Sequence, residues 1–211
     1  MVGGLLVQPE NANSLLVFAH GAGAGMKHPF MEQMSRALAE NGVATFRYQF
    51  PYMERNSKRP DPRPILLATV RSAIAAAHKE LADLPLFAGG KSMGGRMTSM
   101  AAAELPLESV KGIVFFGFPL HPAGTPSTER AEHLSKLHVP MLFLQGTRDS
   151  LADLSLLKPV CERLGERSTL RVIEGADHSF HVLKSSGKPD SQILDELAAA
   201  VAEWSSVLYA K

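Results

Sequence analysis

The segment FAGGKSMGGR (87–96) decides how this chain is interpreted, because it fits two glycine-rich motifs with different functions. GKS (90–92) matches the end of a Walker-type phosphate-binding loop, whereas GKSMG (90–94) matches G-x-S-x-G, a turn that exposes a nucleophilic serine. The phosphate-binding loop requires a glycine at position 85, where this chain has Pro85, which lacks a backbone N–H and has a fixed φ. The sequence therefore favours the second motif, with Ser92 as its serine.

The residues on both sides of Ser92 fit the strand–turn–helix context that G-x-S-x-G requires. An apolar run, LPLFAGG (84–90), precedes the serine, and a helical pattern, MGGRMTSMAAAEL (93–105), follows it. Glycines two positions before and after the serine allow a tight turn without side-chain collisions. The motif alone also fits an ordinary glycine-rich turn, and Lys91 is interpreted as its variable residue.

An acid and a histidine follow Ser92 in the order expected of a Ser-Asp-His arrangement. Asp149 comes after the apolar run 139–146, and His178 comes after the next such run. Open α/β sheets build their sites at such strand ends. Taken singly, Asp149 also fits a turn former or helix cap, and His178 an ordinary loop histidine, with His181 as a competing base. Together they predict a catalytic triad of Ser92, Asp149 and His178.

The segment FAHGAGAGM (18–26) predicts the oxyanion hole of the same site. A glycine-rich turn after a strand can direct a backbone N–H at a developing negative charge, and we choose Ala22 as this donor, with Gly23 as the alternative. The N–H of Met93, directly after the nucleophile, is the predicted second donor. A dinucleotide-binding motif would need a glycine at position 26, where the chain has Met26.

Apolar runs alternate with amphipathic segments along the chain, which indicates an α/β fold with a mostly parallel sheet of about seven strands and helices on both faces. We expect one domain over residues 1–211. A cap domain is not expected, because the strands that end near Phe118 and begin near Val139 leave no room for one. The predicted strands are 4–8, 14–20, 43–50, 84–90, 110–118, 139–146 and 169–175, and the predicted helices are 29–42, 64–82, 93–105, 151–165 and 190–208.

Composition limits the classes of partner and compartment. The formal net charge of +1 and the lack of a dense basic run argue against nucleic acid as a partner. The N-terminal segment has no basic region followed by a long apolar stretch, so neither a signal peptide nor a membrane anchor is expected. A single cysteine, Cys161, fits a reducing compartment, and we expect a cytoplasmic protein. The scattered histidines predict no metal site, and no cofactor is expected.

These motifs together resemble the α/β-hydrolase superfamily over nearly the whole chain. More narrowly, FRYQFPYMER, GGKSMGGR, GFPLHPAGTPSTERAEHL, LFLQGTRD and GADHSF resemble a subfamily of small dienelactone-hydrolase-like proteins, whose relatives include testis-expressed proteins and a chromatin-complex subunit. Dienelactone hydrolases proper have a cysteine nucleophile. Because this chain has Ser92 instead, the resemblance does not imply their substrate.

The function expected from these residues is hydrolysis of a small acyl ester or thioester through an acyl-enzyme intermediate. Gly23, Tyr52, His121 and Phe180 are candidate substrate-binding residues, and the basic loop 55–63 is either a substrate contact or a solvated surface. The alternative is a hydrolase-fold interaction module with a vestigial site. The acyl group, the leaving group and the oligomeric state stay open.

Overall fold

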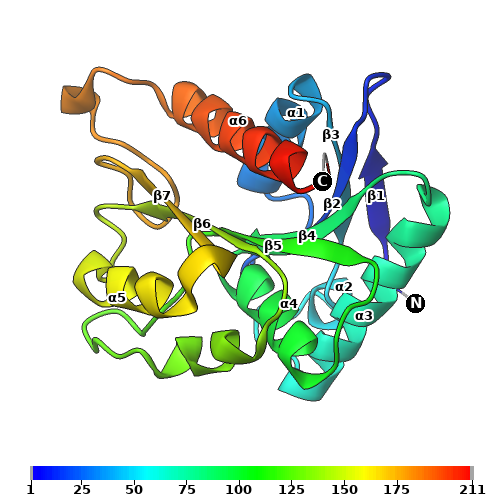
Figure 1. Ribbon diagram of the computed structural model, residues 1–211, viewed down its shortest axis with the longest axis horizontal. Coiled ribbons are helices and arrows are strands. Elements are labelled where there is room, and N and C mark those ends of the chain that lie inside the picture. The colour runs from blue at the N-terminus through cyan, green and yellow to red at the C-terminus, as the bar shows by residue number, and fades with distance from the viewer. Residues whose placement is uncertain (1, 210–211) are drawn as a thin grey trace.

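The fold is a seven-stranded sheet between two layers of helices (Figure 1). A computed structural model describes residues 2–209. The strand order is β1-β3-β2-β4-β5-β6-β7; β1 pairs antiparallel with β3, and the other neighbours pair in parallel. The strands are β1 (Gly4–Val7), β2 (Ser14–Ala19), β3 (Val43–Tyr48), β4 (Leu86–Lys91), β5 (Val110–Phe116), β6 (Met141–Gly146) and β7 (Ser168–Ile173).

Helices cover both faces of the sheet. In Figure 1, α1 and α6 lie side by side on one face, and α2, α3, α4 and α5 lie on the other. The helices are α1 (Pro29–Glu40), α2 (Pro51–Glu54), α3 (Arg63–Glu80), α4 (Met93–Glu104), α5 (Leu154–Leu164) and α6 (Asp190–Tyr209), with short 3-10 segments η1 (Glu129–Lys136), η2 (Gly165–Arg167) and η3 (Lys184–Ser186). None of the helices between residues 2 and 209 is long and apolar enough to cross a bilayer.

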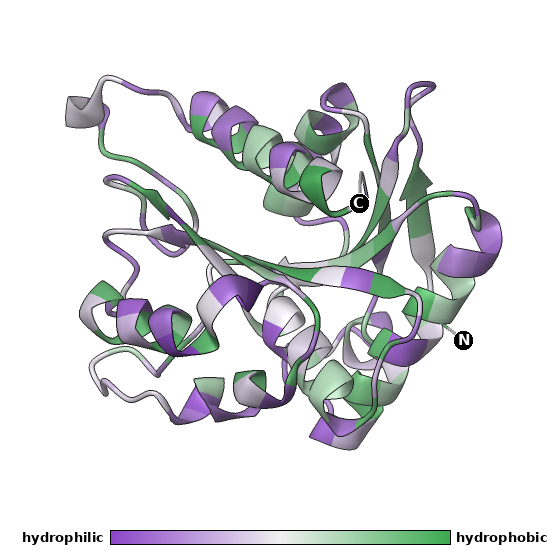
Figure 2. Cartoon of the chain, viewed as in Figure 1, coloured by the Kyte–Doolittle hydropathy of each residue, from purple (hydrophilic) through white to green (hydrophobic). Residues whose placement is uncertain are grey.

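The central strands are apolar on both faces because helices cover them on both sides. Every residue of β2 is buried: Leu15 and Val17 pack toward α3 and α4, whereas Leu16 and Phe18 pack toward α1 and α6. Figure 2 shows the same pattern, with hydrophobic strands and hydrophilic residues toward the outer sides of the helices. This burial explains why continuous apolar runs predicted the strands.

The strand order fixes where a site can form. From β2 the chain continues through α1 to β3 at one side, returns through α3 to β4, and then proceeds to the opposite side through β5, β6 and β7. The order in which the chain adds strands to the sheet therefore changes side between β2 and β4, which are parallel neighbours. In open α/β sheets ligands bind beyond the carboxyl ends of the strands at such a switch point.

The predicted fold class is confirmed, and the sequence missed only short elements. All seven predicted strands and all five predicted helices are present, with ends that differ by a few residues. Segments 51–63 and 119–138, where the sequence predicted neither strand nor helix, contain α2 and η1, which are too short or too irregular to produce a helical periodicity. Between β5 and β6 the chain forms η1 and no cap domain, as the sequence predicted.

The two-sided burial of β2 leads to a stability prediction. Leu16 is fully buried, so Leu16→Ala should lower the free energy of unfolding by about 2–5 kcal/mol through lost burial and the cavity left behind. Leu105 at the end of α4 is 62% exposed, so Leu105→Ala should change it by less than about 0.5 kcal/mol. Urea denaturation of both variants measures these changes in the free energy of unfolding. An equal decrease in the two variants would contradict the burial of β2 on both faces.

Candidate active site

Ser92 lies on a strained turn between β4 and α4. Its φ is 51° and its ψ is −116°, which is rare for a residue with a side chain, and its N–H donates to the carbonyl oxygen of Phe116 (3.1 Å). The flanking glycines are required by packing, because a Cβ at Gly90 or Gly94 would overlap the carbonyl oxygen of Ala19 in β2. The turn therefore combines a strained serine with a very close approach of two strands, as a nucleophile elbow does.

Three side chains from distant parts of the chain form a continuous hydrogen-bonded relay. Ser92 Oγ lies 2.9 Å from His178 Nε2, and His178 Nδ1 lies 2.7 Å from Asp149 Oδ2. These residues follow β4, β6 and β7, so each comes from the carboxyl edge of the sheet. The Asp149 side chain is 1% exposed, whereas that of His178 is 23% exposed. This arrangement can move a proton from the serine to the imidazole and hold the imidazole with a buried carboxylate.

The Asp149 carboxylate is held by two further donors. The amide Nε2 of Gln145 donates to Oδ2, and the N–H of Leu151 donates to Oδ1 at 2.8 Å. Gln145 is fully buried at the end of β6, and the sequence analysis did not identify it. A polar residue in the otherwise apolar run 139–146 was the available signal. Its amide fixes the carboxylate in the orientation that His178 requires.

A second overlooked residue, His20, anchors the glycine-rich turn after β2. The His20 ring is fully buried. Its Nε2 accepts a hydrogen bond from the N–H of Phe50 (3.1 Å), so the ring proton is on Nδ1. Nδ1 donates this proton to the carbonyl oxygen of Gly21 (2.7 Å). Burial lowers the pKa of His20, which favours this neutral form. His20 therefore ties the predicted oxyanion turn to the segment that follows β3.

The two predicted oxyanion donors lie beside the serine. Ala22 lines the same pocket as Ser92, and Met93 is the first residue of α4, so its N–H has no acceptor four residues earlier in the helix. Gly23, the alternative donor, is different, because its N–H donates to the hydroxyl of Tyr52 (3.1 Å). The geometry thus favours Ala22 over Gly23.

A pocket of about 360 Å³ opens beside the serine. Its wall is mainly apolar, with His28 and Lys91 as further polar groups near Ser92 and His178. Pockets of this kind, apolar with a few directed polar groups, bind small molecules. The lining residues are Gly21, Ala22, Ala24, His28, Phe30, Met31, Lys91, Ser92, Leu151, His178 and Ser179.

The four residues predicted to bind substrate do not line this pocket. Gly23 and Tyr52 bond to each other, and Tyr52 is fully buried. His121 is also buried, because its ring bonds to the Pro122 carbonyl oxygen and accepts from the N–H of Asp153. These side chains are engaged in loop packing, and a substrate contact by any of the four residues stays a prediction.

Phe180, a candidate substrate-binding residue, and His181, the competing base, both contact other parts of the protein. Phe180 is 2% exposed, has a positive φ of 65°, and stacks on Phe30 at a centroid distance of 5.9 Å. It therefore supports the pocket from behind. His181 bonds through Nδ1 to Asp190 at the start of α6 (2.8 Å), while His178 contacts Ser92.

Lys91, which the sequence analysis treated as a variable residue, belongs to the wall of the pocket. Its Nζ donates to the carbonyl oxygen of His178 and lies 5.8 Å and 5.4 Å from the ring centroids of Phe30 and Phe180. Burial lowers the pKa of Lys91 to about 8, although nearby Asp149 acts in the opposite direction. No sequence pattern indicated this role, because all its partners lie far along the chain.

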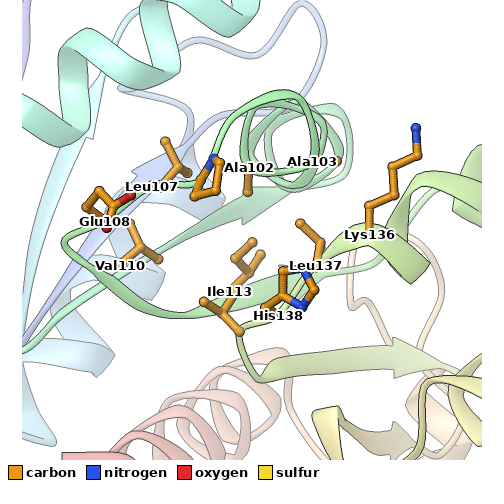
Figure 3. Close-up of a pocket in the computed structure, with 11 residues that line it drawn as sticks. Ala102, Ala103, Leu107, Glu108, Val110, Ile113, Lys136, Leu137 and His138 are labelled. Carbon is orange, nitrogen blue, oxygen red and sulfur yellow. The ribbon is translucent and has the colours of Figure 1, made fainter.

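Another cavity, of about 370 Å³, lies away from the relay (Figure 3). It is formed by the end of α4, the segment that leads into β5 and the segment between η1 and β6. The labelled side chains are mostly aliphatic, and Glu108, Lys136 and His138 are the polar exceptions (Figure 3). None of its lining residues takes part in the relay, so we assign the candidate active site to the pocket at Ser92.

The sheet and the serine relay together define a hydrolase-type α/β protein. The family model described as "Alpha/beta hydrolase domain" matches residues 12–206, and the chain belongs to this family. Membership supports a hydrolase function.

Individual relatives agree on the fold. The structure of an α/β serine hydrolase homologue from Coxiella burnetii is similar, with a TM-score of 0.75, 18% identity, and coverage of 94% of this chain and 90% of that one. The dienelactone hydrolase structure from Anabaena variabilis has a TM-score of 0.74 and 24% identity, with coverage of 96% of this chain and 90% of that one. At these identities the likeness establishes the fold alone.

Two Mycobacterium tuberculosis proteins, whose names propose a phosphoribosyl transferase, are 26% identical to this chain over 207 residues. The match covers 96% of this chain and 43% of each relative. The chain thus spans less than half the length of these curated relatives, and their name does not say which part carries the transferase activity.

The lowered pKa of Lys91 predicts a pH-dependent contribution to stability. In the unfolded chain lysine titrates near its ordinary value of 10.5, so between about pH 8 and that value the unfolded state binds more protons. The free energy of unfolding should therefore rise with pH in this window, relative to Lys91→Met. Urea denaturation of both proteins from about pH 7 to about pH 10 measures the difference. A difference that is flat or falls with pH would contradict the buried ammonium.

Proposed function

We propose that the protein is a serine hydrolase that cleaves a small acyl ester or thioester through an acyl-enzyme on Ser92. The observation that carries the proposal is the relay of 2.9 Å and 2.7 Å from Ser92 through His178 to Asp149. The serine hydroxyl is a weak nucleophile until a base removes its proton, and these distances suit that transfer.

In the first half-reaction His178 Nε2 accepts the hydroxyl proton while Ser92 Oγ attacks the acyl carbon. Asp149 stabilises the imidazolium that forms. The carbonyl oxygen becomes an oxyanion, which the N–H groups of Ala22 and Met93 stabilise; one such donor typically contributes roughly 3–4 kcal/mol to the transition state. The tetrahedral intermediate then expels the alcohol or thiol, which takes its proton from His178.

In the second half-reaction water replaces the departed group. His178 removes a proton from the water as it attacks the acyl carbon, and the second tetrahedral intermediate collapses to release Ser92 and the free acid. The serine recovers its proton from His178, so the enzyme returns to its starting state. The cycle consumes one ester and one water and requires no other reactant.

The pocket supports a small acyl group as substrate. Its volume of about 360 Å³ and its contacts with Phe30, Met31 and Leu151 suit a short apolar acyl chain. The segment between β5 and β6 contains η1 instead of a cap domain, so water and the leaving group have open access. An interfacial lipid substrate would require a deeper or covered apolar site.

Removal of the nucleophile tests the proposal directly. Ser92→Ala should lower kcat on a short-chain ester by roughly 10⁴-fold or more, and Asp149→Asn by roughly 10³–10⁴-fold, because the first removes the attacking atom and the second the partner of the imidazole. A fluorophosphonate probe should label the wild type once, at Ser92, and should not label Ser92→Ala. Unlabelled wild-type protein would instead support the alternative of a hydrolase-fold interaction module.

A chain-length series tests the substrate class. With p-nitrophenyl esters and the matching thioesters, kcat/KM should be highest for short acyl chains and fall for chains that exceed the pocket. Each methylene that fits contributes about 0.8 kcal/mol of burial at most, so the rise with length should stop where the pocket is full. A steady increase up to long chains would contradict the assignment of a small acyl substrate.

A further inference from the structure

Lys91 is the last residue of β4 and immediately precedes the nucleophile. Side chains alternate along a strand, so Lys91 lies on the same face as Phe87, which packs toward α1 and α6. On this face its ammonium meets the rings of Phe30 and Phe180. A charged group in an aromatic environment of this kind requires an explanation, because burial of a charge is costly without a partner.

The partner of the ammonium is the main chain of the catalytic histidine. Lys91 Nζ donates to the carbonyl oxygen of His178, and among residues 2–209 no other donor reaches that oxygen. No carboxylate of the described chain lies within ion-pair distance of Nζ. The two aromatic rings lie within the distance at which cation–π attraction stabilises an ammonium.

The other hydrogen bonds of the loop that carries His178 run within the loop, to the turn after β6 and to the start of α6. Asp177 accepts the N–H groups of Ser179 (2.8 Å) and His181 (3.0 Å), and its own N–H donates to the carbonyl oxygen of His181 (3.0 Å). These bonds give the loop its shape but do not attach it to β4. Apart from the imidazole itself, the hydrogen bond from Lys91 is what connects the loop to the nucleophile strand.

We propose that Lys91 is a positioning residue, which holds the backbone of His178 against the strand that ends in Ser92 and so sets the distance between base and nucleophile. The inference rests on the proposed function. Gly117 lies beside both groups, because a Cβ there would be 3.1 Å from Nζ and 3.4 Å from the His178 ring, and its φ of 70° favours glycine at this position. Lys91 itself does not touch the reacting atoms in this role.

A kinetic comparison separates positioning from substrate binding. Lys91→Met keeps roughly the length of the side chain and removes its donor. The kcat on a short ester should fall by roughly 10–100-fold, because misplacement of a catalytic group by about 1 Å can have such an effect. The KM should change by less than about twofold. The matched control is Lys111→Met, an exposed lysine at the start of β5, which should retain wild-type kcat. A rise in KM with unchanged kcat would identify Lys91 as a substrate-binding cation and would overturn the proposal.

Chemical rescue tests whether the ammonium itself is required. Lys91→Cys, made together with Cys161→Ser, should be as impaired as Lys91→Met. Alkylation of its thiol with 2-bromoethylamine restores an ammonium at nearly the original length and should recover most of kcat. Capping the same thiol with methyl methanethiosulfonate, which adds no hydrogen-bond donor, should not restore kcat. Recovery with both reagents, or with neither, would contradict a positioning hydrogen bond.

Hydrogen exchange tests the inference without any turnover. The amides of Ser179 and His181 should exchange faster in Lys91→Met than in wild type or Lys111→Met, because the loop loses its connection to β4. Unchanged exchange would overturn the positioning role even in an active enzyme. The two tests are independent, because amide exchange does not depend on turnover. Failure of the wild type to react with the fluorophosphonate would refute the proposed hydrolase function without changing the exchange result.

Discussion

The site depends on the close approach of β2 to the turn that carries Ser92. The carbonyl oxygen of Ala19 occupies the space that side chains at Gly90 and Gly94 would need, so the two strands can meet only if both positions are glycine. This contact lets β4 end in a strained turn with the serine at its tip. It also brings the glycine-rich turn after β2 beside the serine, where Ala22 lines the same pocket.

The remaining parts of the site are held by buried polar residues at the same edge of the sheet. Gln145 orients the carboxylate of Asp149, and His20 ties the turn after β2 to the N–H of Phe50. Each such group has lost its contact with water, so its hydrogen bonds fix one orientation of the neighbouring loop. The relay to His178 is therefore embedded in a preorganised set of loops, which is the main physical requirement for electrostatic catalysis.

The sequence predicts the fold and the relay but not their supports. Strands covered on both faces leave continuous apolar runs, and parallel topology places Ser92, Asp149 and His178 at one edge once those runs are found. Tyr52 and His121 are buried in loop packing, which shows that position in a loop does not determine where a side chain points. Lys91 was missed for the opposite reason: its partners Phe30, Phe180 and His178 are remote in sequence, and only the folded chain brings them together.

The lack of a cap between β5 and β6 gives Lys91 added significance. In hydrolases that close over their substrate, the covering segment can complete the site and exclude water. Here the pocket is open, so the spacing of base and nucleophile has to be set by the walls themselves. A cation one residue before Ser92 that holds the backbone of His178 provides this spacing within the sheet edge. The aromatic rings around Lys91 then serve to keep its ammonium directed at that one carbonyl oxygen.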